Sequence, residues 1–346
     1  MFNLGLTNIK NLVDDFIESK QRIPEIRKHY PYKSLKKIRI SFKQNFCNFN
    51  FIRLQTPGQL GVWGNTAFVS TLNPDVELIV NKPNPYLPLK RDSEKNWILH
   101  IEPPAYIRKL GLNDQKMLKD FGRVYTADPE LYEKGGKFIA APPYVHWHIA
   151  LSSYTKNKDN TVYDYDFLKS VATPSEKEIT LATINSNMND LPGHKVRADF
   201  VSKIADENLD FNLYGTPNWS KYKQYKGPTT NGKWPIYSKS KYVLAIENEI
   251  SDYYWTEKFT DAILCYSMPI YYGCPKIRNY FPEGSYIPLD ITRKTAVDDL
   301  REIIKSDFYE KNLPALIEAR NLILTQHNMF SFMNAEMAKL GSAKLL

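Results

Sequence analysis

The stretch SKYVLAIENEISDYYWTEKFTDAILCYSMPIYYGCPKIRNYFPEGSYIPLD, residues 240–290, decides the fold of this chain. Its apolar spacing predicts a strand over 242–246, a helix over 256–267 and a second strand over 269–272. Two short apolar strands joined by a helix are typical of a parallel sheet that helices cover on both faces. This stretch therefore predicts an α/β fold.

The same alternation of apolar strands and helices continues towards both ends of the chain. We expect further strands over 38–42, 76–80, 97–101, 179–184 and 211–214, and helices over 11–28, 196–204 and 295–304, the last capped by Thr295. Residues 154–175 separate these groups and are polar, as linkers between domains usually are. The sequence predicts an N-terminal domain over 1–172 and a C-terminal domain over 173–325.

Length and composition agree with two globular domains and restrict the possible partners. The chain has 346 residues, and its 46 Lys and Arg exceed its 38 Asp and Glu by eight charges, which favours an anionic partner. Cys47, Cys265 and Cys274 form no CxxC pair, so neither a disulfide scaffold nor a cysteine zinc site is expected. The sequence lacks a secretory signal pattern and any run of eighteen apolar residues. We expect a soluble cytoplasmic protein with at most peripheral membrane contact.

Two cations at the starts of predicted helices indicate an anion site. In an open α/β sheet, ligands bind beyond the carboxyl ends of the strands, where Arg197 and Lys258 occupy the first turns of the following helices. A cation there opposes the helix dipole, at a cost of ~0.3–1 kcal/mol when exposed. Two such cations on one rim predict a bound pyrophosphate, although each could instead lie on a solvated helix face.

Residues 240–290 resemble the donor-binding half of glycosyltransferase family 10, the α-1,3/1,4-fucosyltransferases. The family signature, Glu-Asn followed by Thr-Glu-Lys and later Pro-Ile/Val-x-x-Gly, is matched in register by Glu247, Asn248, Tyr254, Thr256, Glu257, Lys258, Pro269 and Gly273. Upstream, residues 179–215 are similar to the family's strand ending in Ser-Asn, its arginine-bearing helix and its strand ending in Tyr-Gly. The resemblance implies that Arg197 binds the donor, together with Asn187, Tyr214 and Gly215.

A second, shorter resemblance lies in the N-terminal half. Residues 97–104, WILHIEPP, are similar to the family's strand followed by Glu-Ser-Pro, whose glutamate is the catalytic base. The resemblance therefore identifies Glu102 as the base, and a carboxylate at the carboxyl end of a buried strand agrees with that role. The alternative is a strand-end residue in a surface turn. The sequence departs from the family at Pro103, at Glu249 after Glu-Asn, and at bulky Trp255 before Thr-Glu-Lys.

The resemblance implies a GT-B fold of two Rossmann-like domains that face a central cleft, with a C-terminal helix over 326–346 completing the first domain. It implies inverting transfer of L-fucose from GDP-fucose to a hydroxyl of a glycan acceptor, without a cofactor or an obligatory metal. In this scheme Glu102 accepts the proton of the acceptor, and Arg197 and Lys258 bind the pyrophosphate. Glu247, Asn248, Tyr254 and Glu257 would orient the rest of the donor, and nucleic acid is not an expected partner.

Two alternative functions remain open on the sequence alone. The same fold could use another nucleotide-sugar donor, as Glu249 and Trp255 suggest, or the excess of positive charge could serve a non-catalytic polyanion or nucleic-acid binder. Weaker signals are Trp63 and Trp147 as acceptor-binding residues, His146 and His148 as structural or acceptor-facing residues, Asp164-Tyr165-Asp166 as a solvated turn, and 222–239 as a mobile loop over the donor.

Overall fold

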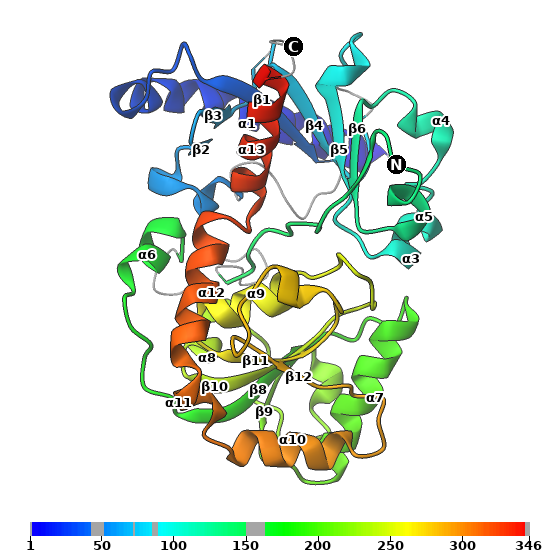
Figure 1. The fold of residues 1–346 in the computed structure, drawn as a ribbon, viewed down its shortest axis with the longest axis vertical. Helices are drawn as coiled ribbons and strands as arrows, with labels where there is room; N and C mark the ends of the chain where they lie inside the picture. The colour runs from blue at the N-terminus through cyan, green and yellow to red at the C-terminus, as the bar shows by residue number, and fades with distance from the viewer. Residues whose placement is uncertain (1, 43–51, 72, 85–88, 150–162, 343–346) are drawn as a thin grey trace. The chain divides into compact units, whose positions relative to one another are not determined.

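The computed structural model describes residues 2–42, 52–71, 73–84, 89–149 and 163–342 of the chain. The chain divides into two compact units (Figure 1). Unit 1 comprises Met1–His146, Asp164–Asp166 and Asn328–Leu346, and unit 2 comprises Trp147–Tyr163 and Phe167–His327. The chain thus leaves unit 1 after His146, rejoins it briefly over Asp164–Asp166 and returns to it after His327, whereas the sequence places its boundaries at residues 172 and 325. Cys47 lies outside the described residues.

Unit 1 is built on a sheet of order β2-β3-β1-β4-β5-β6-β7, in which only β2 and β3 pair antiparallel. Its strands are β1 Lys36–Phe42, β2 Val62–Trp63, β3 Thr66–Phe68, β4 Val76–Val80, β5 Asn96–Leu99, β6 Arg123–Thr126 and β7 Phe138–Ala140. Its helices are α1 Phe2–His29, α3 Pro104–Lys109, α4 Gln115–Leu118, α5 Pro129–Tyr132 and α13 Met329–Ser342. Strands β4 and β5 are buried along their whole length, as expected for parallel strands covered on both faces.

The C-terminal helix α13 belongs to unit 1, where it packs against β2 (Figure 1). Met329, Phe330, Met333 and Met337 form a buried apolar stripe along it. The Phe330 ring meets the Phe68 ring edge-on, with the centroids 4.7 Å apart. This stripe therefore packs α13 into the core of unit 1.

Unit 2 is built on a parallel five-stranded sheet of order β12-β11-β10-β8-β9. Its strands are β8 Ile179–Asn185, β9 Asn212–Gly215, β10 Ser240–Ile246, β11 Met268–Tyr272 and β12 Ile287–Pro288. Its helices are α7 Pro192–Asp206, α8 Trp234–Tyr237, α9 Glu257–Leu264, α10 Ala296–Lys305, α11 Phe308–Lys311 and α12 Leu313–Thr325, while α6 Tyr165–Ser170 spans the two units. The predicted α/β class is confirmed, and both units carry sheets of the Rossmann-like kind expected for the GT-B fold.

Two local predictions were wrong. Helix α9 ends at Leu264, three residues before the predicted end, because Tyr266 adopts a left-handed conformation with φ of 56° and turns the chain into β11. Thr295 does precede α10, but its hydroxyl donates to a carboxylate oxygen of Asp299 at 3.0 Å and does not cap a backbone amide. The residue type predicted the helix start correctly and the hydrogen bond incorrectly.

Candidate functional site

The carboxyl ends of the unit 2 strands share one edge of the sheet, because all five strands are parallel. The residues that follow β8, β9, β10 and β11 therefore lie along this edge. The structure brings six of the sequence-predicted donor residues together there, from α7, α9 and the segment between β10 and α9: Arg197, Glu247, Asn248, Tyr254, Glu257 and Lys258. The candidate site in unit 2 is built around this group.

Glu247 joins the end of β10 to the start of α9. Its buried carboxylate accepts the Thr256 backbone N–H at 2.7 Å and the Thr256 hydroxyl at 2.8 Å. Burial raises the pKa of Glu247, and the neighbouring charge of Glu257 raises it further. Because both carboxylate oxygens bond Thr256, Glu247 acts here by fixing the first turn of α9.

Lys258 and Glu257 project from that fixed turn. The Lys258 ammonium nitrogen lies 3.1 Å from the Thr256 hydroxyl, 3.2 Å from a Glu257 carboxylate oxygen and 3.7 Å from Glu247. Burial alone would raise the pKa of Glu257, but the charges of Lys258 and His148 outweigh burial and hold that pKa well below its usual range. Glu257 is therefore a carboxylate at neutral pH, and Lys258 has a defined position and a partly exposed head group.

Arg197 supplies the second cation of the site, from α7. Its side chain is buried, and it donates to the side-chain oxygen of Asn248 at 2.7 Å. Burial lowers the pKa of Arg197, while the carboxylates of Glu247 and Glu257 oppose that effect. A desolvated guanidinium interacts more strongly with an incoming anion than one in water does.

Gly193 allows α7 to approach Asn248 closely. A β-carbon at this position would lie 1.9 Å from the Asn248 backbone oxygen, which no packed structure tolerates.

We expect Gly193→Ala to displace the first turn of α7, disturb the bond between Arg197 and Asn248, and weaken GDP binding about tenfold. Calorimetric titration checks this prediction. The control is Lys195→Ala, whose side chain on the same turn is 74% exposed. Equal GDP affinity in Gly193→Ala and wild type would contradict it.

The other predicted donor residues lie at or near the same edge. Gly215 ends β9 with φ of 129°, and a β-carbon there would lie 1.8 Å from the Asn185 backbone oxygen. Tyr214 precedes it and is partly buried, Tyr254 is buried, and Asn187 is exposed.

A buried ion pair behind the site was not predicted. Asp261 is fully buried on α9, one turn after Glu257, and accepts Lys233 at 2.7 Å and the backbone N–H of His148 at 3.2 Å. The His148 ring nitrogen lies 3.8 Å from Glu257. The pair thus fastens two distant segments to the helix that carries Lys258. An aspartate among the apolar residues of a predicted helix was the signal that could have revealed it.

The loop over 222–239 is anchored at several points. Lys233 contributes the buried ion pair, and its backbone N–H donates to the Ile149 carbonyl oxygen at 3.0 Å. The Gln224 side chain donates to the carbonyl oxygens of Ala205 and Leu209, each at 3.2 Å. The loop is therefore anchored to α9 through Lys233 and to the end of α7 through Gln224, and Gly227 accepts the Gly215 backbone N–H at 3.1 Å. Its predicted place over the donor stays a prediction.

Glu102, the predicted base, lies in unit 1, three residues after the end of β5 at Leu99. It is partly exposed, and Pro103 behind it starts α3. Asn81, which ends β4 with φ of 61°, accepts the Ile101 backbone N–H at 2.8 Å and donates to a Glu102 carboxylate oxygen at 3.5 Å. The carboxylate thus follows the carboxyl end of β5, although the strand ends at Leu99 and not at residue 101 as predicted.

The weaker predictions have mixed outcomes. Trp63 contacts Tyr165 edge-on at 5.7 Å, and Trp147 is only 5% exposed. The expectation of a solvated turn over Asp164-Tyr165-Asp166 was wrong, because Tyr165 and Asp166 form the start of helix α6. Asp166 accepts the Gly58 backbone N–H at 2.8 Å, and Asp164 accepts the Gln59 side-chain N–H at 2.7 Å. Within the described parts of the chain, no three His, Cys, Asp or Glu residues cluster as a metal site would need.

Residues 174–312 match the family described as Glycosyltransferase family 10 (fucosyltransferase) C-term. This segment belongs to glycosyltransferase family 10. It includes all the predicted donor residues in unit 2, and it confirms the resemblance that residues 240–290 indicated. Glu102 lies outside the matched residues.

Two curated relatives of the chain bear the name GDP-fucose protein O-fucosyltransferase 3. The chain is 23% identical to the one from Homo sapiens and 36% identical to the one from Canis lupus familiaris, in each case over 204 residues and 57% of the chain. It spans 39% of the length of each relative. A crystal structure of an alpha1,3-fucosyltransferase aligns over 82% of both chains at 16% identity, with a TM-score of 0.48. Among the helices that the structure describes, none has the length and apolarity to cross a membrane.

Proposed function

We propose that this protein transfers L-fucose from GDP-fucose to an acceptor hydroxyl, with inversion at the anomeric carbon and without an obligatory metal. The family 10 assignment of residues 174–312 carries this proposal. The two cations at the edge of the unit 2 sheet support it, because Arg197 and Lys258 suit a pyrophosphate. The cytoplasmic location stays a prediction from the sequence.

The donor half of the mechanism follows from the positions of the charges. Negative charge grows on the departing diphosphate as the glycosidic bond breaks, while the sugar acquires oxocarbenium character. Arg197 is fixed by Asn248, and Lys258 is fixed by Thr256 and Glu257, so both cations are in place before the reaction begins. Cations that need no reorganisation stabilise the developing charge most effectively.

The acceptor half depends on Glu102. An acceptor hydroxyl becomes a good nucleophile when a base removes its proton, and Glu102 would take that proton as the oxygen attacks. The contact from Asn81 keeps the carboxylate oriented without supplying a full countercharge. Glu102 therefore combines a fixed position with the ability to accept a proton.

Two acceptor classes follow from different observations. A glycan hydroxyl is the acceptor that the resemblance to α-1,3/1,4-fucosyltransferases implies. A protein hydroxyl is the second candidate, because the two curated relatives are named as protein O-fucosyltransferases. Incubation with radiolabelled GDP-fucose and, separately, a glycan array and a panel of folded protein domains would distinguish them. Label on neither class would contradict the proposed reaction.

The donor is tested by binding. We expect GDP-fucose to bind more tightly than GDP-mannose or any UDP-sugar. Tighter binding of a UDP-sugar would favour the alternative donor, and single-stranded nucleic acid that binds with a steep salt dependence while GDP does not would favour the polyanion binder. Calorimetry on the full chain measures all of these ligands.

Lys258→Ala is expected to weaken GDP binding by about ten- to a hundredfold, because a charge-assisted contact to the pyrophosphate contributes about 1.5–3 kcal/mol. Lys195→Ala is the matched control, since it removes a highly exposed lysine from the neighbouring helix. We expect no change in GDP affinity for the control. Equal affinities of Lys258→Ala and wild type would remove Lys258 from the donor site.

A further inference from the structure

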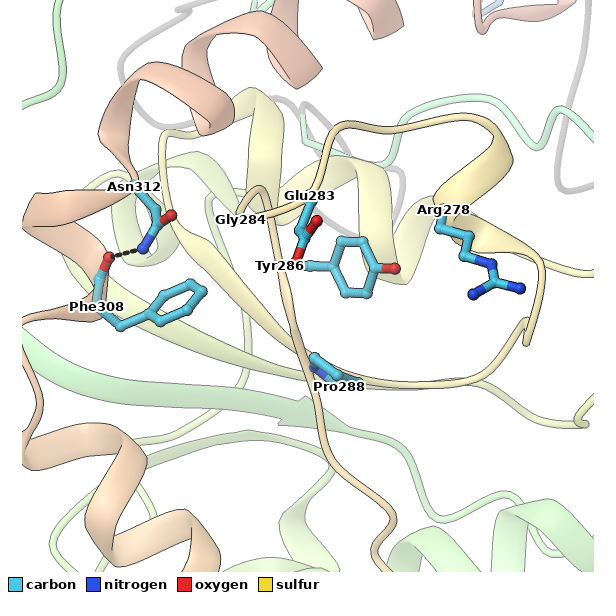
Figure 2. A pocket seen from close by; sticks show the side chains of 7 residues that line it. All are labelled: Arg278, Glu283, Gly284, Tyr286, Pro288, Phe308 and Asn312. Atoms are coloured by element: carbon cyan, nitrogen blue, oxygen red, sulfur yellow. Dashed lines mark hydrogen bonds between the residues drawn. The ribbon is translucent and has the colours of Figure 1, made fainter.

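A pocket of about 700 Å³ opens in unit 2 beside the edge strand β12 (Figure 2). None of the residues assigned to the donor or the base lines it. Figure 2 shows Arg278 and the Tyr286 hydroxyl at one end, Phe308 and Asn312 at the other, and Pro288 between them. The volume lies in the range of small-molecule sites, and the lining combines apolar rings with a few polar groups, as such sites do.

The apolar surfaces of the pocket are held in place. The Tyr286 ring packs edge-on against Phe259 at 5.7 Å and Tyr271 at 6.3 Å. Burial raises the pKa of the Tyr286 hydroxyl, which is therefore neutral and able to donate a hydrogen bond. A partly buried ring with a fixed orientation offers a flat surface without an entropic cost for ordering it.

The rim opposite Tyr286 is also fixed. Asn312 donates its side-chain N–H to the Phe308 carbonyl oxygen at 2.9 Å, the bond drawn in Figure 2. Gly284 adopts φ of 84°, and a β-carbon there would lie 2.4 Å from the Asn312 side-chain oxygen. The missing side chain at Gly284 thus leaves room for that oxygen at the pocket wall.

The charges of the pocket balance. Arg278 and Glu283 are both exposed, and both act electrostatically on the Tyr286 hydroxyl. Among the described residues neither forms a hydrogen bond or an ion pair. Glu283 repels a phosphate or carboxylate ligand, and Arg278 repels an ammonium ligand. The pair of opposite charges beside the Tyr286 ring therefore disfavours ligands that carry a net charge.

We propose that this pocket binds the ring of an uncharged sugar. The apolar C–H face of a pyranose packs on the negative face of an aromatic ring, which Tyr286 and Phe308 supply. Sugar hydroxyls both donate and accept hydrogen bonds, so they can accept from Arg278 and donate to Glu283. Arg278 alone would leave the hydroxyl donors unpaired, and Glu283 alone would leave the hydroxyl acceptors unpaired. The inference rests on the proposed function for the class of ligand, and it adds a second carbohydrate site to the family 10 unit.

The test is saccharide binding to the full chain in saturating GDP, measured by saturation-transfer NMR with lactose, methyl N-acetylglucosaminide and free sialic acid. We expect the neutral sugars to bind. Tyr286→Ala and Phe308→Ala should raise their dissociation constants by about tenfold or more, and Arg278→Ala by less. The control is Tyr222→Ala, which removes a partly exposed tyrosine from the same unit. GDP affinity in each variant reports whether unit 2 is folded. If Tyr286→Ala does not fold, the surface variant Arg278→Ala still tests the sugar pocket.

The two proposals fail separately in this experiment. Lys258→Ala should lose GDP affinity and keep lactose binding. Absence of lactose binding to wild type, equal weakening by Tyr222→Ala, or binding of sialic acid alone would overturn the sugar pocket while leaving the donor site intact. Lactose binding that depends on Tyr286 and Phe308 in a protein that does not bind GDP-fucose would support the pocket and contradict the proposed transfer.

Discussion

Glu102→Gln is expected to lower kcat by about 10²- to 10⁴-fold and to leave GDP affinity nearly unchanged. The amide keeps the shape of the side chain and can still accept the hydrogen bond from Asn81, but it cannot take up a proton. Glu102 belongs to unit 1 and the donor residues to unit 2, so the substitution leaves Arg197, Lys258 and their partners in place. The measurement is the rate of fucose transfer at saturating GDP-fucose, combined with a GDP titration.

The same variant should change the pH profile. The activity of wild type falls at low pH when the base is protonated, and this acid limb should disappear from the residual activity of Glu102→Gln. The control is Glu133→Gln, which alters an exposed glutamate of unit 1 that follows α5. We expect wild-type kcat for the control. Undiminished transfer by Glu102→Gln would show that another group accepts the proton.

Sequence periodicity was sufficient for the elements with a strong apolar pattern. Strand β4 has the predicted bounds 76–80, because its four apolar residues, interrupted only by Glu77, contrast clearly with the polar residues on either side. The strands β7 and β12 have three and two residues, too few for any period, and their pairing depends on neighbours that are distant in sequence. Short edge strands can therefore be identified in the folded structure but not predicted from apolar periodicity.

The site shows the same limit in chemical terms. Lys258 stands in the first turn of α9 as the sequence predicts, whereas α7 begins at Pro192, so that Arg197 lies in its second turn and not in the first. Glu247 was recognisable as a site residue, and its bonds to Thr256 add the support of α9 to its predicted role towards the donor. Identifying that support requires the positions of both oxygens, which no sequence pattern contains.

Contacts between segments that are distant in the chain could not be predicted from the sequence. Lys233 and Asp261 are 28 residues apart, and the Lys233 segment resembles an exposed basic loop until the fold buries it. The sugar pocket likewise combines Arg278, Tyr286 and Phe308 from three separate segments. Features of this kind depend on tertiary packing, so they are where a structure adds most to a family assignment.

The Lys233–Asp261 pair leads to the largest expected effect on stability. Lys233→Met should reduce the free energy of unfolding of unit 2 by about 3–5 kcal/mol at pH 7, because it leaves Asp261 charged, buried and without its countercharge. The matched control is Lys239→Met, which breaks the exposed pair with Glu178 at 2.9 Å and should cost less than about 1 kcal/mol. Urea denaturation followed by fluorescence measures both variants.

The pH dependence of this loss identifies its cause. Burial raises the pKa of Asp261 from 3.8 to about 6, so the folded state binds the proton more tightly than the unfolded state does. The free energy of unfolding contributed by this group therefore falls as the pH rises through about 4 to 6, and the cost is complete above about 6. Removal of the Lys233 charge raises that pKa further, and Lys233→Met should regain much of its stability at pH 5, where Asp261 is neutral.

A double substitution separates charge from packing. Asn at position 261 keeps an acceptor for the His148 backbone N–H without a charge, so Lys233→Met with Asp261→Asn should be more stable at pH 7 than Lys233→Met alone. The double variant should also show no recovery between pH 7 and pH 5, because no titrating carboxylate remains. Losses that are equal in the single and double variants and independent of pH would mean that the lysine stem packs against its surroundings and that the charge contributes little.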